Sequence, residues 1–115
     1  MMEEKIRCSK EELHMSVLHV NKESFDKIIS QSAQTVLVDF WATWCAPCRM
    51  LAPILEDVAA ARPDIIVCKV DVDEERELAM KYGVSSIPTL LVFKGGVLTN
   101  QSVGLIQKDE ILGLL

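Results

Sequence analysis

The stretch that decides the fold is VLVDFWATWCAPC, residues 36–48. Its first part is rich in β-branched and aromatic residues with apolar side chains at consecutive positions, which is typical of a strand buried on both faces. The part after the cysteines carries apolar residues at three- and four-residue spacings, which predicts a helix with a kink at Pro53. The stretch therefore predicts a buried strand followed by a helix that has Cys45 and Cys48 at its N-terminus.

Strands and helices alternate outward from this stretch. Alternation of this kind indicates a parallel sheet covered by helices, and a terminal hairpin adds an antiparallel edge, so we expect an α/β fold. The predicted elements are a strand at 17–20, a helix capped by Asn21, a strand at 35–41, the cysteine helix, a strand at 65–70, a helix at 71–82 that stops at Gly83, a hairpin at 89–93 and 97–103 across Gly95-Gly96, and a closing helix from Gln107.

Length and composition favour one globular domain. The chain has 115 residues, of which 50% are hydrophobic and 25% charged, and a formal net charge of −5. The acidic balance argues against nonspecific binding to nucleic acid or to anionic membranes. We expect a polar extension at residues 1–16 and a domain at 17–115. Because the start lacks an apolar secretion segment and no run is long enough to span a membrane, we expect a cytoplasmic location. We also expect the chain to be a monomer.

Two of the four cysteines are placed for thiol chemistry. Cys8, Cys45, Cys48 and Cys68 are too few and too unevenly spaced for a disulfide scaffold. At a helix N-terminus, unpaired N–H groups and the helix dipole stabilise an anion, so the Cys45 thiolate is the predicted nucleophile. Cys48 lies one turn further on and can attack a mixed disulfide on Cys45, which predicts the role of resolving thiol.

The sequence resembles the thioredoxin family along its length from about Val17. The resemblance rests on residues 36–50 with their WCAPC segment, on the following APIL at 52–55, and on shorter matches at 69–73, 82–84, 87–90, 93–96 and 103–104. It implies the thioredoxin fold, with three parallel strands and an antiparallel C-terminal hairpin flanked by helices. It also implies a protein thiol–disulfide oxidoreductase that reduces protein disulfides through Cys45 and Cys48. One departure is Ala46, where the family usually has glycine.

Two further positions are assigned from strand parity together with the resemblance. Asp39 interrupts an apolar strand, so burial should raise the pKa of its carboxyl group toward the range useful for proton transfer. The resemblance makes Asp39 a general base that acts through water on Cys48, with Lys69 on the neighbouring strand tuning it. The alternative is that Asp39 and Lys69 form a buried ion pair with a structural role only.

The resemblance also implies a substrate-docking surface, a reductase and no bound cofactor. The Ile87–Pro88 peptide bond is expected to be cis, beside the disulfide. Disulfide-containing proteins are the expected substrates, and a thioredoxin reductase fed by NADPH is the expected source of electrons. The residues implied in docking are Trp44, Ala46, Pro47, Ile87, Pro88 and Gly104.

Other readings remain open at this point. The chain could be an oxidase-like variant, a docking module without turnover, or a zinc or iron–sulfur protein, although the single cysteine pair lacks well-placed further ligands. His14 and His19 are interpreted as surface residues and Cys68 as a small buried side chain. Cys8, on the extension, has no assigned role.

Overall fold

A five-stranded mixed sheet forms the centre of the computed structural model, which describes residues 17–115. The strand order is β1-β3-β2-β4-β5; β1, β3 and β2 are parallel, β4 is antiparallel to β2, and β5 is antiparallel to β4. The predicted α/β class and the antiparallel hairpin are confirmed. The strands are β1 (Val17–His19), β2 (Val36–Trp41), β3 (Ile66–Asp71), β4 (Thr89–Lys94) and β5 (Val97–Val103).

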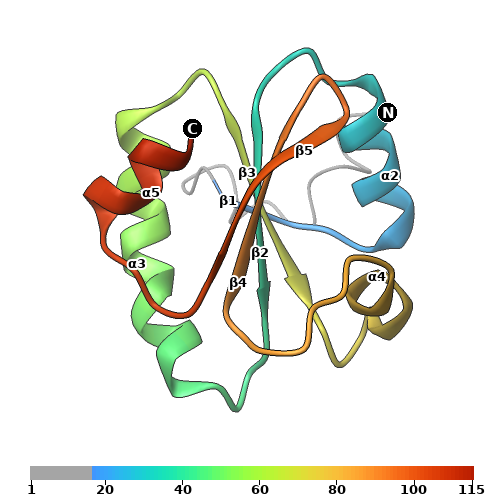
Figure 1. Ribbon diagram of the computed structural model, residues 1–115, viewed down its shortest axis with the longest axis vertical. Coiled ribbons are helices and arrows are strands. Elements are labelled where there is room, and N and C mark those ends of the chain that lie inside the picture. Colours follow the sequence, from blue (N-terminus) through green and yellow to red (C-terminus); the bar gives the residue numbers. More distant parts are fainter. Residues whose placement is uncertain (1–16) are drawn as a thin grey trace.

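Helices cover both faces of the sheet, in the chain order that the sequence predicts. Figure 1 shows α3 and α5 on one side of the sheet and α2 and α4 on the other. The helices are α2 (Lys22–Gln31), α3 (Ala46–Ala61), α4 (Arg76–Lys81) and α5 (Lys108–Leu114). Pro53 lies inside α3, which the structure assigns as a single helix.

The two faces of β2 pack into two different apolar clusters. Val38 and Phe40 belong to the cluster under α2 and α4, whereas Leu37 packs with Leu51 and its neighbours from α3. Successive strand side chains point to opposite faces, so Asp39 lies on the α3 face with Leu37. The strand therefore places one carboxyl group inside the apolar layer beneath the cysteine helix.

Local sequence signals account for several element ends. The Asn21 side chain accepts the Ser24 N–H at 2.9 Å and caps α2, as predicted. Gly83 follows α4 with φ +67°, the left-handed conformation that commonly ends helices. Gly95 and Gly96 both have positive φ, which the tight turn between β4 and β5 requires.

The helix predicted at residues 71–82 is shorter than expected, and this is a correction. Asp71 is the last residue of β3, and its carbonyl oxygen accepts the N–H groups of Glu74 and Glu75. Its carboxylate oxygen also accepts the Asp73 N–H at 2.9 Å. Asp side chains form such local turns readily, so the chain turns at residues 72–75 before α4 begins at Arg76.

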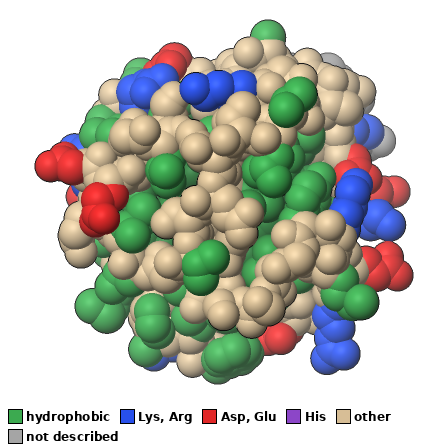
Figure 2. Space-filling view, in the orientation of Figure 1, with side chains coloured by type: hydrophobic (Ala, Val, Ile, Leu, Met, Phe, Trp, Pro, Cys, Tyr) green, Lys and Arg blue, Asp and Glu red, His purple; other side chains and the backbone are tan. Residues whose placement is uncertain are grey.

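Three further features concern strands of the sheet. Cys68 is fully buried in β3, which confirms its prediction. His19 keeps part of its surface exposed, as its interpretation as a surface residue expects, and packs edge-on against Trp41 with ring centroids 6.1 Å apart. Figure 2 shows few charged side chains on the face that carries β5, a strand whose sequence VLTNQSV has none.

Some expectations fall outside the part of the chain that the structure describes. These are the polar extension at 1–16, Cys8 and His14. Among residues 17–115, no helix is long and apolar enough to cross a membrane.

Candidate active site

Cys45 and Cys48 form a disulfide at the start of α3, so the structure holds the oxidised form of the pair. Cys45 is the N-cap residue, and the Cys48 N–H donates to Cys45 Sγ at 3.2 Å. Cys45 is 5% exposed and Cys48 is 1% exposed. The more exposed residue of the pair is therefore the one whose sulfur contacts an amide of the first helical turn, where negative charge on sulfur is stabilised.

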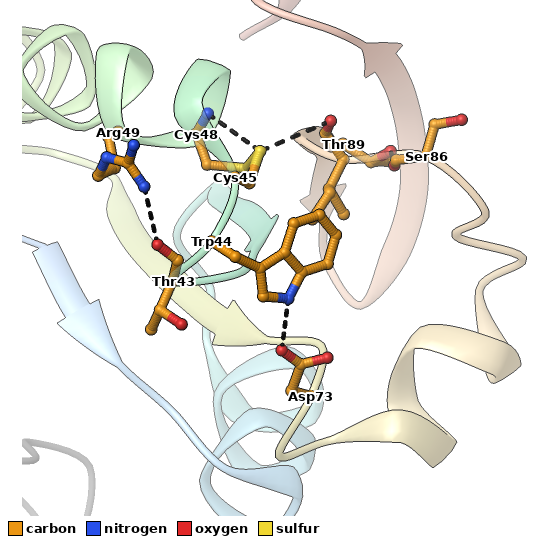
Figure 3. Close-up of a disulfide and its surroundings, with 9 residues drawn as sticks. Thr43, Trp44, Cys45, Cys48, Arg49, Asp73, Ser86 and Thr89 are labelled. Carbon is orange, nitrogen blue, oxygen red and sulfur yellow. Dashed lines mark hydrogen bonds between the residues drawn. A yellow bond between two sulfur atoms is a disulfide. The ribbon is translucent and has the colours of Figure 1, made fainter.

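Hydrogen bonds fix the loop that leads into the helix. The Cys45 N–H donates to the carbonyl oxygen of Ala42 at 3.2 Å. The Arg49 guanidinium, from the first turn of α3, donates to the carbonyl oxygen of Thr43 at 2.9 Å (Figure 3). The loop is thus tied to the helix on one side and to the end of β2 on the other.

A second loop approaches the disulfide from the start of β4. The Ile87–Pro88 peptide bond is cis, as the resemblance implied, and the Ile87 carbonyl oxygen lies 3.9 Å from Cys45 Sγ. The Thr89 hydroxyl donates to the Ser86 carbonyl oxygen at 2.6 Å, and the Gly104 N–H donates to the Pro88 carbonyl oxygen at 2.8 Å. The structure therefore brings Ile87, Pro88 and Gly104 together next to the cysteine pair.

The surface around the disulfide is partly apolar and accessible. Trp44 is 66% exposed. Ala46 and Pro47 are also exposed, Ile87 is half-buried, and Pro88 is buried beneath them. The Trp44 indole Nε1–H donates to Asp73 Oδ2 at 2.8 Å, and Figure 3 shows the indole ring between the disulfide and this carboxylate.

Asp39 is fully buried, and its environment makes the carboxyl group a weak acid. Within residues 17–115, neither carboxyl oxygen has a hydrogen-bond partner, so Asp39 makes no direct hydrogen bond to Cys45 or Cys48. Burial, opposed by the positive charge of Lys69, raises the pKa of Asp39 from 3.8 to about 7. Asp39 and Lys69 are directly paired across β2 and β3, which confirms the parity argument that put them on one face.

Lys69 connects this buried acid to a solvent-accessible region. Its Nζ lies 4.4 Å from the centroid of the Trp41 ring, a cation–π contact. Both residues line a cavity of about 510 Å³ at the carboxyl ends of β1, β2 and β3. Asp39 therefore has, as its register partner on β3, a lysine that solvent can reach.

Three polar residues near the disulfide were not singled out from the sequence. Arg49, Asp73 and Thr89 hold the two loops and the exposed indole through the hydrogen bonds above. Asp73 follows the end of a predicted parallel strand, where loop residues gather at one edge of the sheet, and this was the one available signal. Arg49 and Thr89 carried no signal, because their partners are backbone carbonyl groups that no side-chain pattern encodes.

Metal coordination is an alternative chemistry for a Cys-x-x-Cys pair. Across residues 17–115, no group of three or more His, Cys, Asp or Glu side chains is placed to hold a metal ion.

Comparison with known proteins agrees with this geometry. The thioredoxin family model matches residues 16–115. Among curated relatives, the thioredoxin of Chlamydia trachomatis is 46% identical over 84% of this chain and 92% of its own. The Staphylococcus aureus thioredoxin is 45% identical over 88% and 96%, respectively. A solved mutant thioredoxin from Halobacterium salinarum superposes with a TM-score of 0.78 at 40% identity, covering 85% of this chain and 86% of that one.

A mixed sheet that presents a disulfide at a helix N-terminus, beside a cis-proline loop and with a buried carboxyl group on the strand that leads into that helix, defines a thiol–disulfide oxidoreductase. Within that class, the chain belongs to the thioredoxin family. It acts on protein disulfides by dithiol–disulfide exchange through Cys45 and Cys48.

Proposed function

We propose that the chain is a general protein-disulfide reductant, in which Cys45 attacks the substrate and Cys48 resolves the intermediate. The observation that carries the assignment is the contact of the Cys48 N–H with Cys45 Sγ at the helix start. This contact and the greater exposure of Cys45 favour Cys45 as the thiolate that meets an incoming disulfide.

The exchange runs in two displacements. The Cys45 thiolate attacks one substrate sulfur, the substrate disulfide breaks, and its other sulfur leaves as a thiolate that takes a proton from solvent. Cys48 then loses its proton and attacks Cys45 Sγ, which releases the second substrate thiol and closes the Cys45–Cys48 disulfide. Two electrons pass from the two cysteines to the substrate.

Asp39 is the proposed base for the second displacement, with Lys69 tuning it. A carboxyl group with a pKa of about 7 is present in both protonation states near neutral pH, so it can take a proton and return it. Because no donor in the described part of the chain bonds the Asp39 oxygens, the transfer from Cys48 runs through water. The register pairing with Lys69 supports its tuning role, since its positive charge lowers the pKa that burial raises.

Substrate is proposed to bind as an extended segment on the accessible surface beside the disulfide. The apolar side chains of Trp44 and Ile87 offer contacts to side chains that flank the substrate cysteine. Ala46 and Pro47 border the same surface, and Pro88 and Gly104 hold the shape of the loop beneath it. The fixed backbone around Ile87 supports pairing with an added strand.

The electrons are proposed to come from a thioredoxin reductase that uses NADPH, since both cysteines must be returned to thiols after each cycle. We place this electron transport in the cytoplasm, where disulfide reduction is favoured and thiols are kept reduced. No bound cofactor is needed on this chain, which we propose works as a monomer.

Insulin reduction driven by dithiothreitol tests the proposal. The wild-type chain should accelerate precipitation of the insulin B chain, and Cys45→Ser should remove the acceleration. A wild-type chain without acceleration would instead support a docking module. Equilibration with glutathione measures the reduction potential of the Cys45–Cys48 pair, and so tests whether the chain reduces or oxidises its substrates. A reductant should have a potential near that of thioredoxins, about −270 mV. A potential near about −120 mV would make the chain an oxidase-like variant.

A further inference from the structure

The exposed tryptophan beside the disulfide is held by a single polar contact. Trp44 is 66% exposed, yet its Nε1–H donates to Asp73 Oδ2 at 2.8 Å. Among residues 17–115, this indole makes no other hydrogen bond. An exposed indole otherwise samples several side-chain rotamers, so this contact selects one of them.

Asp73 is itself fixed by the turn in which it lies. Its N–H donates to Asp71 Oδ1 at 2.9 Å, and the next N–H groups along the turn donate to the Asp71 carbonyl oxygen. The N–H of Val72 donates to the Trp41 carbonyl oxygen at 2.9 Å, which ties the turn to the end of β2. The acceptor for the indole therefore belongs to the rigid edge of the sheet.

We propose that Asp73 is a positioning residue for substrate docking, which fixes the Trp44 indole in the orientation that receives a protein substrate. The inference rests on the docking surface proposed above. Pre-organising a side chain strengthens binding because its freedom has been lost before the substrate arrives. The hydrogen-bond acceptor is what matters in this account, and the negative charge is not.

Three variants separate the acceptor from the charge. Asp73→Ala removes both, and Asp73→Asn keeps a carbonyl acceptor and removes the charge. Glu74→Gln removes a neighbouring charge whose side chain makes no hydrogen bond within residues 17–115. Steady-state reduction of insulin gives kcat and KM for each variant. Bis(2-hydroxyethyl) disulfide serves as a substrate too small to use the docking surface.

We expect Asp73→Ala to raise KM for insulin about two- to tenfold, the effect of losing one hydrogen bond, with kcat unchanged. Asp73→Asn and Glu74→Gln should stay near the wild type, and all four proteins should reduce the small disulfide equally. An unchanged KM in Asp73→Ala would overturn the proposal. An equal rise of KM in all three variants would also overturn it, because the negative charge of the turn, and not the hydrogen-bond acceptor, would then affect substrate binding.

The orientation itself has an independent readout that does not depend on turnover. The indole N–H signal of Trp44, assigned from the spectrum of Trp44→Phe, should exchange with solvent faster in Asp73→Ala than in wild type and Asp73→Asn. Equal exchange in all three would contradict the positioning role. If the wild type reduced neither disulfide, the proposed function would fail while this signal still reported on the contact.

Discussion

Asp39 is the residue at which stability and chemistry are most closely linked. A buried carboxyl group in the apolar layer under α3, with no hydrogen-bond partner among residues 17–115, favours its neutral form. The folded chain therefore holds a proton that the unfolded chain releases near pH 3.8. Between that pH and about 7, folding takes up a proton. The contribution of Asp39 to stability is therefore full below pH 3.8 and is lost as pH rises to about 7.

Replacing this carboxyl group should stabilise the protein at neutral and alkaline pH. Asp39→Asn stays neutral at every pH, so its free energy of unfolding should exceed that of the wild type by about 2–4 kcal/mol at pH 8. This difference in the free energy of unfolding should become smaller as pH falls to about 4. Urea unfolding across this pH range measures it, with the exposed Asp73→Asn as the control. A gap independent of pH would show that Asp39 does not carry a raised pKa.

The same substitution should slow resolution of the mixed disulfide. Without the carboxyl group, Cys48 must lose its proton to solvent, so release of substrate from Cys45 should slow about tenfold or more near pH 7. The step caused by a group with a pKa of about 7 should disappear from the pH–rate profile. Single-turnover mixing, with quenching by an alkylating reagent, measures the release. A profile that matches the wild type would leave Asp39 with a structural role only.

At the scale of elements, the helices depend on what the backbone can adopt at their ends. Gly83 ends α4 with φ +67° and has open space where a Cβ atom would lie, so Gly83→Ala isolates the cost of the left-handed backbone. We expect a loss of about 1–2 kcal/mol in the free energy of unfolding.

Gly113 provides the matched control. It lies inside α5, is exposed, and also has open space at Cβ, so Gly113→Ala should add about 0.5–1 kcal/mol. Urea unfolding measures both changes in the free energy of unfolding. A loss for Gly83→Ala and a gain for Gly113→Ala would confirm the left-handed backbone at Gly83 and the helical backbone at Gly113. A stabilising Gly83→Ala would contradict the left-handed end of α4.

The elements also show where sequence reasoning succeeds and where it stops. The apolar run of β2 and the spacing along α3 predicted their own burial, and strand parity correctly paired Asp39 with Lys69. Helical charge patterning placed a helix start at Asp71, but a local turn of that aspartate with Asp73 took precedence. The Trp44–Asp73 contact joins residues 29 apart, and no local pattern encodes such a pair.

At the scale of the whole molecule, the fold explains why one short segment carries the reaction. The parallel strands bring β2 and β3 to the edge where α3 begins, and the antiparallel β4 brings its preceding loop, with Ile87, to the same edge. Asp39 lies on β2, and the cysteine pair lies at the start of α3, the next element along the chain. One short segment therefore carries both the disulfide and the buried acid. Our account makes Cys45 the entry point for every substrate.

The most direct test of that account is to trap the mixed disulfide. Cys48→Ser, reduced and in a Cys8→Ser background, is mixed with insulin, and the adduct is located by mass spectrometry of its peptides. We expect one adduct per chain on Cys45, and none when Cys45→Ser replaces Cys48→Ser. An adduct on Cys68, or equal adducts on Cys48 in the Cys45→Ser variant, would contradict Cys45 as the nucleophile.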